Sequence, residues 1–297
     1  MRSGLRSGFT LVELLVVVAI IGLLGGILLP GLTKARRKAR QVRCMNHQKQ
    51  IVFVQLAYEG DHGKYSPTVA TIGWRDWDWS WVEPMTMTTF FEYKHKYPKG
   101  NHRATSEYLG DYVDEVEIMF CPSAPKEYPF MHEAWKAGDS WDNPMTGDRY
   151  LDPFYGMYCF YWGYIGVLPD CRKGIFRGPL RSEGGSRRSK LLVSDYFGKD
   201  YWRVSGGTYA SCERFYQSGV TGQYATAMEY WYCLPSDKPL ESMTIRLHAG
   251  YTDGHVECYG AKEVMEMRVS STPDGKEADP MWAELYGDIF IPRKAIY

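Results

Sequence analysis

Two histidines and an aspartate near the C-terminal end are the residues whose types and spacing best suit chemistry. His248 precedes Asp253-Gly254-His255, so two imidazoles and a carboxylate lie within eight residues. Imidazole and carboxylate groups together can hold a divalent metal ion. The spacing therefore supports the hypothesis of a metal site at His248, Asp253 and His255. With Asp195 as a further catalytic candidate, a metal-dependent hydrolase is one reading of the chain.

The same stretch also has the pattern of a β-hairpin, which needs no metal. Asp253-Gly254 is favoured in type I′ turns, and Leu247 and Val256 would lie on the flanking strands. The sequence contains no Gly-x-Ser-x-Gly motif, no P-loop and no glycine-rich dinucleotide turn. Paired acids such as Asp76 and Asp78 are too ordinary to indicate glycosidase chemistry. We therefore expect the structural interpretation to hold and the chain not to be an enzyme.

A tryptophan-rich stretch is the next candidate for binding. Trp77, Trp79 and Trp81 alternate with smaller polar residues, and on a β-strand this period of two places three indoles on one face. One interpretation is that they cover the hydrophobic face of a sheet or helix. The other is an exposed aromatic strip that stacks on sugar rings or on a partner protein.

Cysteines and charge limit the classes of function. The seven cysteines are Cys44, Cys121, Cys159, Cys171, Cys212, Cys233 and Cys258. They lack the CxxC spacing of zinc sites. In an oxidising compartment all seven are disulfide candidates, and the sequence leaves their pairing open. With 35 basic and 35 acidic residues the net charge is zero, which argues against nucleic acid as a partner.

The N-terminal element is an apolar stretch interrupted by one acid. From Phe9 to Leu29 only Thr10 and Glu13 are polar. A helix of this length spans roughly 30 Å, the thickness of the hydrocarbon core of a bilayer. A carboxylate within such a segment costs roughly 2.5–3.5 kcal/mol on insertion scales and usually has a partner and a function. No basic residue lies within the run, so we expect the partner of Glu13 to come from elsewhere.

The segment Gly8-Phe9-Thr10-Leu11-Val12-Glu13 resembles the processing site of type IV pilins and type II secretion pseudopilins. The resemblance implies that a prepilin peptidase cuts after Gly8 and that Phe9 becomes the N-methylated end. Glu13 matches the family's glutamate at the fifth mature position, and Pro30 matches its helix-bending proline. The resemblance also implies that Glu13 pairs with the Phe9 amino group of a neighbouring subunit, and this pairing neutralises the buried charge on assembly. A cleaved secretory signal has a shorter apolar core, so a plain membrane anchor is the main alternative.

Several stretches of the body are similar to large pseudopilin-like proteins related to the major pseudopilin of type II secretion. They are Cys44-Met45-Asn46-His47-Gln48-Lys49-Gln50-Ile51, Tyr58–Pro67, Phe120-Cys121-Pro122-Ser123, Ser189–Asp195 and Asp253-Gly254-His255-Val256. The spacer between His248 and Asp253 is shorter than the one these proteins have. The resemblance also allows calcium near the C-terminal end, held by carboxylates and carbonyls, although histidine is a poor calcium ligand.

The elements expected from these patterns give an α+β fold. A long helix runs through the apolar segment to about residue 58, with Pro30 as its bend and Gly60 and Gly63 as breakers. An antiparallel β-sheet domain with long loop insertions packs on it, with strands at Leu191–Ser194 and within 200–235 and 243–260. After Val264 we expect a polar tail. The expected domains are a leader (1–8), a transmembrane or filament-core segment (9–32), a periplasmic helix (33–59) and a β-rich domain (60–297).

The combined reading is a structural subunit that polymerises into a helical filament of a type II secretion or type IV pilus-like system. Its expected partners are other copies of itself, the prepilin peptidase, an inner-membrane assembly platform with its ATPase, and membrane lipid before assembly. The alternative is a membrane-anchored binding module for glycan or protein.

The expected location is the inner membrane, in a single pass, with the C-terminal domain in the periplasm, and a filament after assembly. Counting positive charges alone would place the body in the cytoplasm, because the basic run Lys34–Arg43 outweighs Arg2 and Arg6. The processing motif and the cysteine-bearing, aromatic-rich body favour export.

Overall fold

The computed structural model describes most of the chain between residues 10 and 296. The described residues are 10–69, 71–74, 79–82, 84–88, 104–122, 130–141, 156, 158–168, 174–183, 187–200, 207–210, 232–235, 246–268 and 288–296. The chain divides into two units, Met1–Val42 and Arg43–Tyr297.

The helix α1 spans Leu11–His62 and continues through Pro30. We predicted its end near residue 58, but it continues to His62. Gly60 lies inside it, since one glycine costs a helix only about 1 kcal/mol. The last turn is held by stacking of the His62 ring on Tyr58, with ring centroids 4.0 Å apart. Gly63 ends the helix with a left-handed φ of 70° and donates its N–H to Glu59 O at 2.7 Å.

In the second unit, α1 buries a stripe of side chains. The stripe recurs at spacings of four and three residues, which keeps it on one helix face. It consists of Cys44, Gln48, Ile51, Gln55 and Tyr58, all less than 9% exposed. Two members are polar. Of these, Gln55 accepts from Ser66 N at 3.1 Å and donates to Ser66 Oγ at 2.8 Å.

A four-stranded antiparallel sheet packs against this part of α1. Its strands, in spatial order, are β11 (Val256–Tyr259), β10 (Leu247–Tyr251), β6 (Leu191–Asp195) and β3 (Tyr158–Phe160). Gly250 lies where the layers meet: a Cβ there would come within about 3.1 Å of both Val52 on α1 and Val193 on β6. Every residue of β3, β6 and β10 is buried, so this sheet forms the centre of the unit.

A second antiparallel sheet has seven strands. Their spatial order is β5 (Ile175–Arg177), β4 (Ile165–Val167), β12 (Val264–Arg268), β13 (Asp288–Pro292), β7 (Phe197–Asp200), β8 (Gly207–Ala210) and β9 (Tyr232–Pro235). A separate hairpin joins β1 (Thr71–Trp74) and β2 (Trp79–Val82). Our prediction of a polar tail after Val264 was wrong: β12 and β13 lie within the sheet and bury Val264, Met267, Ile289 and Ile291.

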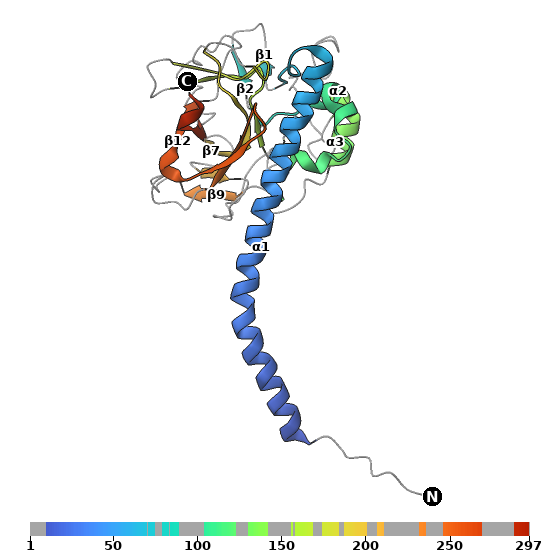
Figure 1. The fold of residues 1–297 in the computed structure, drawn as a ribbon, viewed down its shortest axis with the longest axis vertical. Coiled ribbons are helices and arrows are strands. Elements are labelled where there is room, and N and C mark those ends of the chain that lie inside the picture. The colour runs from blue at the N-terminus through green and yellow to red at the C-terminus, as the bar shows by residue number, and fades with distance from the viewer. Residues whose placement is uncertain are drawn as a thin grey trace, which may run out of the picture. The chain divides into compact units, whose positions relative to one another are not determined.

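Two short α-helices, α2 (Thr105–Leu109) and α3 (Met131–Ala137), complete the second unit. Short 3-10 helices occupy Gly110–Tyr112, Val116–Met119, Gly138–Ser140, Ala261–Glu263 and Arg293–Ala295. In Figure 1 the C-terminal part of α1 runs between the strands on one side and α2 and α3 on the other. The α+β class predicted from the sequence is confirmed.

Candidate functional site

The start of α1 carries the acid that we singled out in the apolar segment. Leu11 is the first helical residue, and Thr10 precedes it. Glu13 Oε2 accepts from Thr10 N at 2.7 Å and from Thr10 Oγ1 at 2.8 Å, and Glu13 N donates to Thr10 Oγ1 at 3.2 Å. This reciprocal pattern is a capping box. Gly8 and Phe9 lie outside the described residues.

The capping box gives Glu13 a partner within its own chain. We expected none, because no basic residue lies within the apolar run, but the hydroxyl and the amide of Thr10 satisfy the carboxylate instead. The Thr-x-x-Glu spacing was visible in the sequence and could have predicted it. The carboxylate still has the capacity to receive a cation, because both partners in the box are neutral donors.

The apolar side chains in the N-terminal half of α1 are exposed among the described residues. Large apolar side chains from Leu11 to Leu32 are mostly half exposed or more, for example Leu11 at 78% and Ile27 at 70%. Among the described helices, α1 is long and apolar enough to cross a membrane. Such a surface is stable only in lipid or against other apolar surfaces.

The second cluster is buried and brings together residues from α1, β6 and β10. Asp195 ends β6, His248 is the second residue of β10, and Cys44 and Gln48 lie one turn apart on α1. All four are at most 2% exposed. Strand pairing sets two of them side by side, because Ser194 of β6 pairs with Ala249 of β10.

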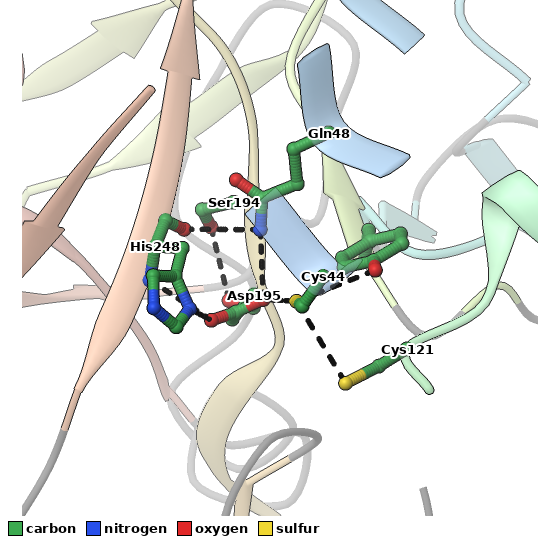
Figure 2. Close-up of polar contacts among 7 residues, drawn as sticks. Cys44, Gln48, Cys121, Ser194, Asp195 and His248 are labelled. Carbon is green, nitrogen blue, oxygen red and sulfur yellow. Dashed lines mark hydrogen bonds and ion pairs between the residues drawn. The ribbon is translucent and has the colours of Figure 1, made fainter. Parts of the chain in front are cut away.

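The carboxylate of Asp195 is the centre of this cluster (Figure 2). Its Oδ1 accepts from Cys44 Sγ at 3.0 Å and from Gln48 Nε2 at 2.7 Å. Its Oδ2 accepts from the backbone N of His248 at 2.8 Å and from the ring Nδ1 at 2.7 Å. Gln48 Nε2 also donates to His248 O at 3.3 Å. The carboxylate thus has four donors, and the Asp195 side chain is only 3% exposed.

Electrostatics keeps the Asp195–His248 pair charged. Burial raises the pKa of Asp195, but the charge of His248 and the donated hydrogen bonds outweigh burial and hold this pKa below its usual value. Burial lowers the pKa of His248, but the charge of Asp195 and the hydrogen bond to it raise the net pKa to about 10. At neutral pH the cluster is therefore an ion pair enclosed by hydrogen-bond donors.

Cys44, Asp195 and His248 have ligand atoms within 4.8 Å of one another, and they form the one group of three potential metal ligands among the described residues. In a tetrahedral zinc site, bonds of about 2.0–2.3 Å hold the ligand atoms roughly 3.3–3.8 Å apart. Here the sulfur and the ring nitrogen lie 3.0 and 2.7 Å from carboxylate oxygens, which are hydrogen-bond distances. The spacing fits protons better than a metal ion.

The residues of our hypothetical metal site do not lie together. His248 is buried against Asp195, whereas Asp253 and His255 are exposed in the loop between β10 and β11. There His255 Nδ1 pairs with Asp253 Oδ1, and the His255 ring stacks on Tyr251 with centroids 4.5 Å apart. Within the described part of the chain, no group of three carboxylates offers calcium a site.

The hairpin between β10 and β11 is confirmed, but the type I′ turn was wrong. Gly254 has a positive φ of 88°, whereas Asp253 does not, and a type I′ turn needs both. Gly254 N donates to Tyr251 O at 2.9 Å, and Tyr251 N donates to His255 O at 3.0 Å. The loop is therefore the three-residue form with glycine in the left-handed region.

The tryptophan strip is described only in part. Trp79 and Trp81 lie two residues apart on β2, opposite Trp74 and Ile72 of β1. Trp77 lies outside the described residues. The alternation predicted for Trp79 and Trp81 is therefore present in the backbone, and binding of a glycan or protein stays a prediction.

The cysteines fall into several environments. Cys44, Cys121 and Cys159 are buried thiols, and Cys258 on β11 is an exposed thiol. The Cys121 thiol donates to Cys44 Sγ at 3.8 Å. Cys233 lies on the backbone of β9, and Cys171 and Cys212 lie outside the described residues.

Comparison with known proteins identifies the N-terminal part. Residues 5–29 match the family described as the prokaryotic N-terminal methylation motif. The chain is 37% identical over 66 residues to the type IV wide pilus major component PilA4 of Thermus thermophilus, which covers 22% of this chain and 50% of that protein. It is 34% identical over 68 residues to the type IV major pilin protein PilA of Myxococcus xanthus. This match covers 23% of this chain and 31% of that protein.

A third relative is matched over more of its length. The chain is 35% identical over 67 residues to the competence protein ComGC of Bacillus subtilis, which covers 23% of this chain and 68% of that protein. The chain matches half or less of the length of each of the two pilins. No solved structure matches the chain. The apolar helix α1 and the methylation motif are those of a membrane-anchored prepilin. The chain therefore belongs to the family of type IV pilin-like proteins that carry the N-terminal methylation motif.

Proposed function

We propose that the chain is a filament subunit of a type II secretion or type IV pilus-like system. In this proposal a prepilin peptidase removes residues 1–8 and Phe9 becomes the N-methylated end. Residues 9–32 anchor the subunit in the inner membrane and later form the filament core, residues 33–59 continue the helix in the periplasm, and residues 60–297 form the filament surface. An inner-membrane platform and its ATPase drive the assembly.

The observation that carries the proposal is a long apolar helix surface that stays exposed in the part of the chain that the structure describes. An anchor needs such a surface in lipid, and a filament core needs it against neighbouring copies of the same helix. The match to the methylation motif, residues 5–29, overlaps this surface, and the three relatives are similar to this chain over 66 to 68 residues. Because the relatives include two pilus components, the filament is the favoured environment.

Glu13 supplies the step that separates a subunit from a plain anchor. In the single chain its carboxylate is held by Thr10. In a filament, we propose that the amino group of Phe9 from a neighbouring copy approaches the same carboxylate. The Coulomb attraction within an ion pair is far stronger in a low-dielectric environment than in water, although each charge must first be desolvated. The capping box therefore keeps the acid satisfied until the neighbour arrives.

The buried cluster supports a structural role for the body and not a catalytic one. Cys44, Asp195 and His248 are each at most 2% exposed, so a substrate has no access to them. The Cys44 thiol donates to the carboxylate of Asp195, and the His248 imidazole binds the same carboxylate. The cluster instead fixes α1 on β6 and β10.

The test uses the full-length chain in its native cell. Gly8→Ala is expected to leave an uncut precursor, which N-terminal mass spectrometry detects. Glu13→Ala is expected to be cut and membrane-bound like the wild type, yet reduced at least tenfold in the sheared filament fraction.

Glu133→Ala, an exposed acid on α3, is the matched control and should enter filaments normally. Wild-type amounts of the Glu13→Ala variant in sheared filaments would contradict the role of Glu13. Normal processing of the Gly8→Ala variant would contradict the cleavage site.

A further inference from the structure

The pairing of two buried cysteines can be inferred from the structure. We propose that Cys44 of α1 and Cys121 form a disulfide bond in the exported protein. The bond would tie α1 to the segment that follows the 3-10 helix Val116–Met119. This inference rests on the proposed function in one respect, the export of the body into an oxidising compartment.

The two sulfur atoms are already neighbours although their residues are 77 positions apart in the sequence. Cys121 Sγ lies 3.8 Å from Cys44 Sγ, and both residues are buried, at 3% and 0% exposure. A disulfide bond is about 2.05 Å long, so the sulfurs must approach by roughly 1.8 Å. Figure 2 shows the two side chains pointing toward each other from α1 and the facing segment.

The backbone beside Cys121 is anchored on α1 independently of the thiols. His47 Nδ1 contacts Phe120 O at 3.0 Å, and His47 lies one turn beyond Cys44 on the same helix. This contact fixes the residue before Cys121 against the helix that carries Cys44. The two cysteines are thus held in position by a hydrogen bond that oxidation does not disturb.

The surrounding network tolerates the loss of the Cys44 proton. In the thiol form Cys44 Sγ donates to Asp195 Oδ1 and accepts from Tyr158 OH at 3.3 Å. After oxidation Asp195 keeps three of its four donors, one from Gln48 and two from His248. Tyr158 OH can still donate to the disulfide sulfur. No buried carboxylate or hydroxyl of this set is left without a partner.

The reaction is thiol–disulfide exchange with a disulfide oxidant, either a protein oxidoreductase or glutathione disulfide. Two S–H bonds and the oxidant's S–S bond break, the Cys44–Cys121 S–S bond forms, and two protons and two electrons pass to the oxidant, which leaves as two thiols. Because both sulfurs are buried, exchange precedes the final docking of α1 on the body.

Trypsin separates the two cysteines onto different peptides. Cleavage after Arg43 and Lys49 releases residues 44–49, and cleavage after Arg103 and Lys126 releases residues 104–126, each with one cysteine. The full-length chain is extracted from membranes of the native cell under acid, its thiols are alkylated in denaturant, and non-reducing peptide mapping follows. A second sample is reduced in urea and refolded in detergent with reduced and oxidised glutathione.

We expect the two peptides to be recovered linked, with a mass 2 Da below the sum of the two thiol peptides, in both samples. Cys258→Ser, an exposed thiol on β11, should leave the link intact, whereas Cys44→Ser should leave Cys121 alkylated. A link in the refolded sample alone would support the pairing and contradict export.

Several results would overturn the pairing. One is a refolded chain in which both cysteines are alkylated, and another is Cys44 linked to a different cysteine. A third is two alkylated thiols together with one zinc per chain, because two thiolates on one zinc also lie roughly 3.8 Å apart.

Discussion

At the scale of single residues, two acids show two ways in which neighbouring donors hold a carboxylate. Glu13 is held by the backbone and hydroxyl of Thr10, which are neutral groups at the start of a helix. Asp195 is held by a charged histidine and by donors from α1. The first arrangement leaves the acid open to a further cation, and the second encloses it completely. We therefore connect Glu13 with assembly and Asp195 with the stability of the body.

The enclosed pair predicts how stability depends on pH. The pKa of His248 is raised from 6.5 to about 10 in the folded protein. The protonated His248 side chain contributes fully to the free energy of unfolding below its unfolded pKa of about 6.5. This contribution is lost as the pH rises toward 10. The free energy of unfolding of the full-length chain in detergent should therefore fall between pH 7 and 9, by at most about 1.4 kcal/mol per pH unit from this group.

Two variants isolate the contribution of His248. His248→Gln removes one partner of a buried ion pair and should lower the free energy of unfolding by roughly 3–5 kcal/mol at pH 7. It should also flatten the decline of this free energy with rising pH, as urea unfolding measures it. His255→Gln changes an exposed histidine and should retain the decline. An equally steep decline in His248→Gln would show that another group causes it.

The sequence identified several of these residues but not their partners. Asp195 and His248 were among the candidates for a catalytic or metal site, together with Asp253 and His255. Their pairing requires β6 and β10 to be neighbours in a sheet, although 53 residues separate the two positions. Cys44 was predicted as a disulfide candidate on the helix, and only the docking of α1 on the sheet brings it to Asp195. Long-range packing of this kind leaves no periodic signal in one sequence.

At the scale of elements, local patterns predicted what local forces decide. The long helix, the strand predicted at Leu191–Ser194 and the hairpin of β10 and β11 followed from composition and period. The short helices α2 and α3 were missed, since five and seven residues are too few to show a helical period. The strands β12 and β13 were also missed, because the second lies after a stretch rich in charge and proline.

The close approach of two loops at Gly178 is the sharpest constraint on any element. A Cβ at position 178 would lie 1.6 Å from Tyr161 O, which is a backbone atom and cannot rotate away. Gly178 also donates its N–H to Tyr164 O at 2.8 Å and accepts from Arg188 Nη1 at 2.8 Å. Only a residue without a side chain permits these contacts.

Gly178→Ala should therefore destabilise the body by more than roughly 3 kcal/mol, or prevent folding, because the backbone must move. Gly110→Ala is the matched control, since a Cβ there meets no atom within 4 Å and the backbone is already helical. It should remain within about 1 kcal/mol of the wild type. Urea unfolding of the full-length chain in detergent measures both, and equal stability of the two variants would refute the constraint.

At the scale of the whole molecule, the two units have different origins of stability. The first unit is a helix segment whose apolar side chains are exposed, and under the proposed function lipid or neighbouring copies would cover them. The second has its own core of aromatic and aliphatic side chains around two antiparallel sheets. The similarity to the three relatives lies in the N-terminal region and covers about 22–23% of the chain. The family of the chain was therefore predictable from its N-terminus, and the architecture of the body was not.

The central claim is that the mature chain begins at Phe9 and is built into a filament. The most direct measurement is mass spectrometry of the N-terminal peptide of this chain in filaments sheared from the native cell. We expect a peptide that begins with N-methylated Phe9 and contains Glu13. A chain that begins at Met1, or that is absent from filaments and remains wholly in the membrane fraction, would contradict the account.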